Sequence, residues 1–149
     1  GLYRCLMSAT NSFENSLLLL IFNGTTIANI ADNAASSPAT DLYISLHTGD
    51  PGEAGSQNTT EASYTSYARV AVARTSGGWT VSANNASNTA AVIFPTATGG
   101  SNTLTHFGIG LSSSGAGTLL FKGALGASLA VSNGITPRYE IGELVINVD

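Results

Sequence analysis

The sequence predicts a mainly β fold, an antiparallel, jelly-roll-like β-sandwich of about eight strands preceded by one helix. Its 149 residues, 43% of them apolar, are enough for one domain with its own core. From residue 41 onward apolar and polar residues alternate in short runs, which is the period of half-buried strands. Turn-forming pairs such as Asn133-Gly134 separate these runs. We expect a single domain with a flexible segment 1–10, a helical segment 11–33 and a sandwich over 41–149.

Residues 11–23 are predicted to form the helix. Asn11 and Glu14 make a capping-box pattern, and Gly24 stands where a helix commonly ends. Residues 25–33 are expected to add a short second helical turn. Apolar residues surround most of the helix, so it should pack under the sandwich or against another subunit. Its expected buried stripe consists of Phe13, Leu17, Leu20 and Ile21, widened by Leu18, Leu19 and Phe22.

The first strand is predicted over residues 41–48. Leu42, Ile44 and Leu46 fall on its buried face, while Tyr43, Ser45 and His47 fall on the opposite, exposed face. A long polar loop follows over residues 53–63, and loops of this length are often functional. The remaining strands are expected at 67–75, 79–82, 90–94, 103–111, 118–123, 128–131, 138–141 and 143–148.

Charge is scarce in this chain. Charged residues make up 9% of the sequence, against roughly 25% in an ordinary soluble domain, and the net charge is −4. Lys122 is the single lysine, so no basic cluster exists to neutralise nucleic-acid phosphates. The apolar run 16–22 is shorter than the roughly 20 residues of a membrane-spanning helix. A neutral polar surface loses little on desolvation and favours a component of an assembly.

The sequence offers little support for catalysis or a cofactor. His47 and His106 are the two histidines, and no nucleophile-elbow motif is present. His47, Asp50 and His106 are possible metal ligands, but their spacing matches no known zinc or calcium pattern. Cys5 has no partner for an internal disulfide and is either an idle thiol or an intermolecular bridge. We therefore expect no enzyme and no cofactor. The acidic residues that could supply the catalytic carboxylate pair of a glycoside hydrolase are Asp41, Asp50, Glu53, Glu61, Glu140 and Glu143.

Two groups of residues are candidates for binding. Tyr43, Tyr64, Tyr67 and Trp79 would suit a sugar-binding shelf, although packing inside the sandwich explains them more simply. Arg69 is expected to pair with a carboxylate at a sheet edge or an interface. The candidate assembly interface comprises Leu17, Leu18, Leu19, Leu20, Phe22, Arg69, Arg138, Tyr139 and Val145.

Five sequence segments carry a resemblance to a known family. In chain order they are Leu42–Gly52, Tyr67–Val72, Phe94–Ala97, Thr105–Gly110 and Gly134–Pro137. Together they resemble a family of small tailed-phage and prophage proteins commonly labelled phage tail fibre protein. The resemblance extends over residues 8–149, although this chain is more charged than the family pattern at 138–143. It implies a virion protein with no catalytic residues to carry over.

From this resemblance we expect a structural subunit of the phage particle, made in the bacterial cytoplasm. Its role would be that of a tail fibre or of a capsid decoration protein, and its partners would be capsid or tail subunits and further copies of itself. Nucleic acid and membranes are not expected partners. The alternative is a module that binds carbohydrate on the host surface, and a glycan hydrolase is a weaker third reading.

Overall fold

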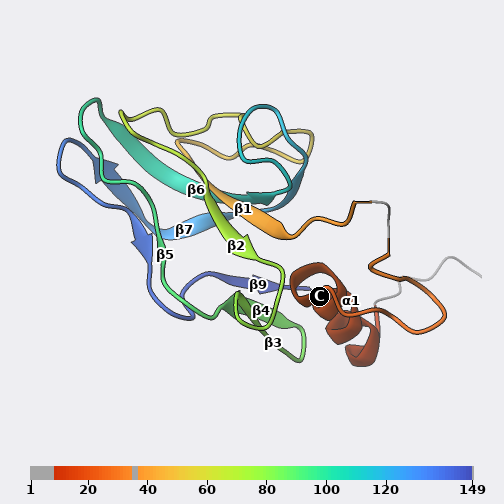
Figure 1. The fold of residues 1–149 in the computed structure, drawn as a ribbon. Helices are drawn as coiled ribbons and strands as arrows, with labels where there is room; N and C mark the ends of the chain where they lie inside the picture. Colours follow the sequence, from red (N-terminus) through yellow and green to blue (C-terminus); the bar gives the residue numbers. More distant parts are fainter. Residues whose placement is uncertain (1–8, 35–36, 149) are drawn as a thin grey trace, which may run out of the picture.

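The computed structural model describes residues 9–34 and 37–148 (Figure 1). In these residues one helix, α1 (Asn11–Asn23), precedes nine strands, and every pair of neighbouring strands is antiparallel. The prediction of a mainly β, antiparallel sandwich with one N-terminal helix is therefore confirmed. The strands are β1 (Asp41–His47), β2 (Val70–Ala73), β3 (Trp79–Ser82), β4 (Asn85–Asn88), β5 (Val92–Ile93), β6 (Asn102–Gly110), β7 (Leu119–Val131), β8 (Arg138–Tyr139) and β9 (Val145–Asn147).

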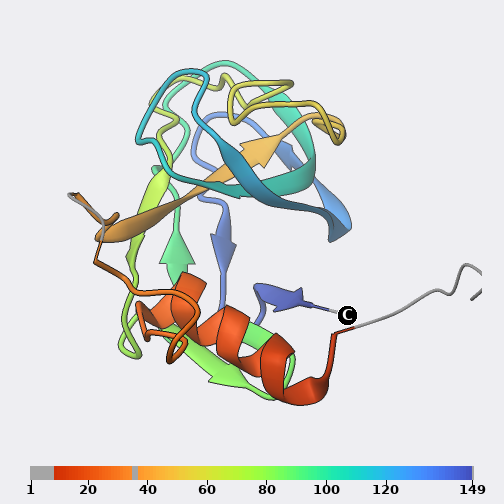
Figure 2. The same cartoon turned by 90° about the vertical axis from the view of Figure 1, so that its right-hand side faces the viewer.

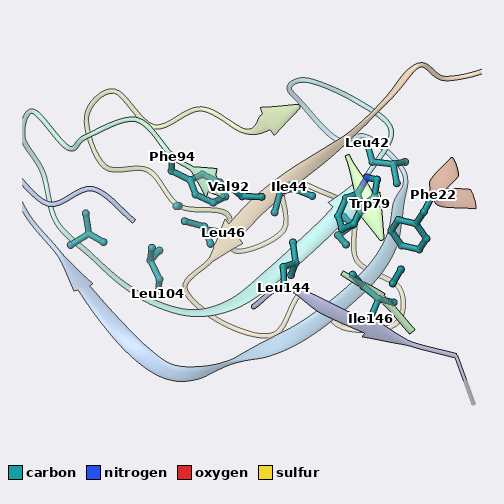
Figure 3. Close-up of a cluster of buried hydrophobic side chains, with 14 of the residues drawn as sticks. Phe22, Leu42, Ile44, Leu46, Trp79, Val92, Phe94, Leu104, Leu144 and Ile146 are labelled. Carbon is teal, nitrogen blue, oxygen red and sulfur yellow. The ribbon is translucent and has the colours of Figure 1, made fainter. Parts of the chain in front are cut away.

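The strands form three sheets. The largest has the order β2-β1-β6-β7, a second has the order β3-β4-β9, and β5 pairs with β8. Figure 2 shows the four-stranded sheet on one side of the molecule, with α1 and the β3-β4-β9 sheet on the other. The apolar core lies between them (Figure 3). Fully buried core residues include Phe22, Leu42, Ile44, Trp79, Leu104, Ile109 and Leu144.

The helix occupies the predicted residues, but its cap and its buried face differ from the prediction. Thr10, not Asn11, is the N-cap, and its hydroxyl accepts a hydrogen bond from the backbone N–H of Phe13 at 3.4 Å. Gly24 ends the helix with φ 64°, as predicted. No helix in the described part of the chain is long and apolar enough to cross a membrane.

The buried stripe of α1 consists of Glu14, Leu18 and Phe22. The predicted stripe of Phe13, Leu17, Leu20 and Ile21 is wrong, because Phe13 is exposed and the other three are half-buried. The packing of Phe22 sets the rotation of α1 about its own axis, because the Phe22 ring packs edge-on against the Trp79 ring with 4.7 Å between centroids. So many apolar residues surround the helix that periodicity alone could not choose between two neighbouring stripes.

The chain after Gly24 does not continue as a helix, so the predicted helical turn over 25–33 is wrong. Ile27 and Ala31 form an isolated antiparallel bridge that closes a tight loop, and Asn29 within it has φ 62°. A left-handed residue of this kind interrupts a right-handed helix. The predicted flexible segment 1–10 falls mainly on residues 1–8, which, with Cys5, lie outside the described residues.

Three strand predictions also need correction. β4 (Asn85–Asn88) was not expected, because its sequence is polar and Ala86 is its one apolar residue. The separate strands predicted at 118–123 and 128–131 are one strand, β7, with a register shift in its pairing with β6. The strand predicted from residue 67 begins only at Val70.

Candidate assembly surface

Ser45 and His47 form a buried pair on β1, where exposed side chains were predicted. Both are fully buried, and Ser45 Oγ lies 2.8 Å from His47 Nε2. His47 Nδ1 lies 2.7 Å from the carbonyl oxygen of Thr59, which can only accept, so Nδ1 carries the proton. Burial lowers the pKa of His47, partly offset by the Thr59 hydrogen bond. The imidazole is therefore neutral near pH 7, and its Nε2 accepts from the Ser45 hydroxyl.

The Ser45–His47 distance is that of a nucleophile and its base, but the surroundings do not suit catalysis. Neither side chain reaches solvent, and the third partner is a backbone carbonyl where a carboxylate usually orients the base. The polar loop over residues 53–63 covers the pair, with Thr59 and Glu61 lying against His47. The pair instead anchors this loop to β1.

A buried ion pair joins the same loop to the chain before β2. Arg69 donates to Glu61 through Nε at 2.7 Å and through a terminal nitrogen at 3.0 Å. Its other hydrogen bonds reach the carbonyl oxygens of Ser112 at 2.9 Å and Gly115 at 2.6 Å. Tyr67 donates its hydroxyl to Glu61 at 3.0 Å, and burial raises the pKa of this phenol. Arg69 therefore pairs with a carboxylate as predicted, beside the edge strand β2, and both partners belong to the same chain.

Gln57 completes this network beside the loop that follows β6. Its side chain is fully buried and exchanges two hydrogen bonds with the backbone of Ser112, at 2.9 and 3.1 Å. A Cβ at Gly110 would collide with Gln57, so close approach of this side chain requires glycine there. The polar loop and the 111–118 loop are thus locked together, which is a structural role that nothing in the local sequence of Gln57 predicted.

The three candidate metal ligands do not form a site. His106 lies opposite His47 in the register of β1 and β6, but His47 is fully buried, and Asp50 is exposed in the turn after β1. There Lys122 Nζ lies 3.1 Å from a carboxylate oxygen of Asp50 and 3.2 Å from one of Glu53. The Gly52 backbone N–H, and then Lys122, lower the pKa of Asp50, and the two carboxylates raise that of Lys122. Within residues 9–34 and 37–148, no group of three or more His, Cys, Asp or Glu side chains is placed to hold a metal ion.

The aromatic residues pack within the fold, which is the explanation that the sequence favours over a sugar-binding shelf; Tyr43 is half-buried on β1. Trp79 is fully buried against Phe22, and Tyr64 is buried with its hydroxyl donating to the carbonyl oxygen of Pro95 at 2.9 Å. Tyr67 packs edge-on against Tyr64, 5.4 Å between ring centroids. These rings hold the sandwich together, and they offer no stacking platform for a sugar.

The described surface has an apolar groove between the C-terminal half of α1 and the ends of β6 and β7. Leu111 and Leu120, 43% and 40% exposed, line it together with half-buried Leu20 and Ile21. The rest of the lining is Asp32, Asn33, Pro38, Ala39, Leu42 and Arg74. We call this the α1 groove; its volume is about 330 Å³. The predicted interface includes Leu20 from this groove but not Ile21, Leu111 or Leu120. Leu111 and Leu120 flank a serine- and glycine-rich loop and follow no regular period.

Arg74 shapes one end of the α1 groove and was also missed. Its guanidinium donates to the carbonyl oxygens of Ile21 at 2.7 Å and Leu20 at 2.8 Å, in the last turn of α1. It further contacts Asn33 at 3.2 Å and Ala39 at 2.5 Å. A cation here satisfies free carbonyls and complements the negative end of the helix dipole. The hydrogen-bond donors of the Arg74 guanidinium are therefore occupied by acceptors of the same chain.

The predicted interface residues lie in different environments. Leu18 and Phe22 are fully buried in the chain's own core, and the Arg69 side chain is 2% exposed, so these three cannot meet a partner in this conformation. Val145, 46% exposed, lies on β9 at the edge of its sheet. The remaining residues are at least partly exposed: Leu17, Leu19, Leu20, Arg138 and Tyr139. Arg138 forms an ion pair with Glu140 at 2.7 Å, and the Tyr139 ring packs edge-on against Phe107.

A comparison with protein families identifies a match over nearly the whole chain. The family model described as Podophage GP4 fiber I protein gp80 matches residues 8–147. No curated protein matches the chain.

Proposed function

The chain belongs to the family of the podophage GP4 fiber I protein gp80, and on this premise we propose that it is a tail-fibre subunit that works by packing against other virion proteins through the α1 groove. The family makes it a structural protein of the phage particle in contact with other virion proteins, and suggests that it is not an enzyme. The tail-fibre role in preference to capsid decoration, and the use of the α1 groove, are our proposal.

The observation that carries the proposal is the apolar, nearly uncharged character of the α1 groove. Leu111 and Leu120 expose large side chains to water beside the half-buried wall of α1. Fully burying such a side chain contributes on the order of 1.5–3 kcal/mol, so covering this wall would stabilise a complex.

Charge at the α1 groove does not oppose docking. Arg74 directs its guanidinium into carbonyl oxygens of the chain, and Asp32 is the other charged residue of the lining. The helix itself contributes Glu14 as its one charged residue, and that side chain is buried. The partner that fits is therefore a virion protein presenting an uncharged, apolar segment, because a charged segment would lose its hydration against a lining in which Asp32 is the one exposed charge.

The test uses phage particles that lack this protein and purified chain added back to them. Leu111→Lys and Leu120→Lys each place a charge on the wall of the α1 groove, and we expect each to reduce attachment to the particles at least about tenfold. Ile141→Lys is the matched control, because Ile141 is 70% exposed and lies outside the groove. Thermal unfolding of the three variants should be alike.

Attachment of Leu111→Lys and Leu120→Lys at the level of the unchanged protein would contradict the use of the α1 groove. Attachment of the unchanged chain to head proteins in preference to tail proteins, seen by cryo-electron microscopy of reconstituted particles, would contradict the tail-fibre role.

A further inference from the structure

The second half of β7 is an exposed sheet edge that carries neither charge nor proline. β7 pairs with β6 alone and ends the order β2-β1-β6-β7, and Figure 2 shows it at the outer margin of that sheet. Residues 124–130 are all exposed except half-buried Leu125. Edge strands usually carry charges or proline against unwanted pairing, and this segment has neither. Its free backbone groups are therefore suited to accept another strand.

The sequence of this segment identifies the strand that fits it. Residues 124–130 read Ala-Leu-Gly-Ala-Ser-Leu-Ala, which is the same in both directions apart from the Gly126 and Ser128 pair. An antiparallel pair of identical strands is related by a twofold axis, so each residue opposes its mirror position about the centre. With Ala127 at the centre, Leu125 opposes Leu129, alanine opposes alanine, and Gly126 opposes Ser128.

We propose that the chain dimerises by antiparallel pairing of the 124–130 edge of β7 with that of a second copy, about a twofold axis through Ala127. The proposal rests on the proposed function, since it supplies the homo-oligomeric contact of a fibre subunit. Large side chains oppose large ones and small oppose small ones, which is the arrangement that stabilises cross-strand pairs. No like charges meet, because Lys122 lies outside the paired segment and is held by Asp50 and Glu53.

β7 bulges away from a regular pairing with β6 inside this segment. Its register with β6 passes from Leu129 opposite Leu104 directly to Ala124 opposite His106, so residues 125–128 stand against Thr105 alone. A bulge of this kind disrupts the ladder locally, so residues 125–128 lack regular partners in β6. The twofold axis through Ala127 would place the same bulged residues of the second copy opposite them.

Cysteine cross-linking tests the register. In a Cys5→Ser background, Ala127→Cys places two thiols directly opposite one another, with Cα atoms about 4.5–5.5 Å apart, within the range of a disulfide. We expect a covalent dimer on mild oxidation. Ala130→Cys is the matched control: it is equally exposed and on the same strand, but its counterpart is six residues away along the partner, so no disulfide should form.

Charge substitution tests the same pairing without a covalent bond. A Cβ at Gly126 meets nothing within 4 Å, so a side chain fits there. Gly126→Lys with Ser128→Lys opposes lysines across the interface, and we expect self-association to weaken on the order of tenfold. Gly126→Lys with Ser128→Glu opposes lysine and glutamate, and should restore the dimer seen by light scattering.

The outcomes separate this proposal from the proposed function. A dimer that persists in the double-lysine variant, or equal cross-linking of Ala127→Cys and Ala130→Cys, would overturn the β7 pairing. A monomer or a trimer at tens of micromolar, still able to attach to particles through the α1 groove, would overturn the pairing and leave the proposed function standing. Failure to attach through the groove would instead count against the proposed function, whatever the oligomeric state.

Discussion

Replacing Arg69 with Met tests whether the buried ion pair holds the loops on the outer side of the four-stranded sheet. The change keeps most of the side-chain volume but removes the cation from Glu61 and the donors from the carbonyls of Ser112 and Gly115. Arg69 is 2% exposed and Glu61 16%, so water replaces these contacts poorly. We expect Arg69→Met to destabilise the protein far more than a surface substitution would.

The expected loss can be worked from the two partners. Removing one member of a buried pair costs about 3–5 kcal/mol, because a charge is left without its counter-ion, and the partial exposure of Glu61 favours the lower end. At this chain length a loss of about 3–5 kcal/mol corresponds to a fall in Tm of roughly 6–20 °C, and a loss of about 3 kcal/mol to roughly 6–12 °C. Glu61→Gln combined with Arg69→Met removes the stranded carboxylate and keeps an acceptor for Tyr67. The double variant should therefore lose less stability than Arg69→Met alone.

Urea unfolding followed by tryptophan fluorescence is the assay. Trp79 is the single tryptophan of the chain and is fully buried, so its emission reports the loss of the core. A loss below about 1 kcal/mol in Arg69→Met would refute the reasoning, since a pair of that strength behaves like a surface salt bridge. So would a double variant whose loss equals the sum of the two single losses, because neighbouring members of one network should not be additive.

Three further predictions concern single positions. Because burial lowers the pKa of His47 in the folded protein, the unfolded chain binds the proton first, and stability should fall below about pH 6.5 by up to about 1.4 kcal/mol per pH unit. His47→Gln should remove that part of the pH dependence in urea titrations. Leu18→Ala should cost about 2–5 kcal/mol and Leu17→Ala clearly less, because only Leu18 is fully buried; equal losses would contradict the observed rotation of α1. Thr10→Ala should cost about 1 kcal/mol by thermal unfolding, whereas a similar loss in Asn11→Ala would contradict the assigned cap.

The buried face of β1 shows what a period of two can predict. Leu42, Ile44 and Leu46 are buried as the alternation indicated. The alternation also predicts that the opposite, polar face with Ser45 and His47 is exposed, yet both residues are fully buried. The alternation within a strand predicts which residues share a face, but it does not predict whether a distant loop covers the polar face. The length of the polar loop was the one available signal, because long loops in compact domains usually do more than connect.

β4 was missed for a related reason. Its residues Asn-Ala-Ser-Asn have low strand propensity, and the strand forms because β3 and β9 supply partners on both sides. Hydrogen bonds satisfy the buried side chain of Asn88. It accepts from the backbone N–H of Leu144 at 2.9 Å and donates to the carbonyl oxygens of Ala90 and Glu140. Such tertiary hydrogen bonds have no counterpart in local sequence.

For the helix α1, the sequence predicts that some apolar surface stays exposed, but it does not predict where that surface lies. Its apolar residues outnumber the places that one small sheet can cover, so an exposed apolar remainder was predictable from composition and length alone. Which residues form that remainder depends on the rotation of α1, and the fit of Phe22 against Trp79 sets that rotation. The remainder then joins Leu111 and Leu120, which are brought there by the ends of β6 and β7. The amount of surface left for a partner follows from the sequence, whereas its location follows only from the packing of the core.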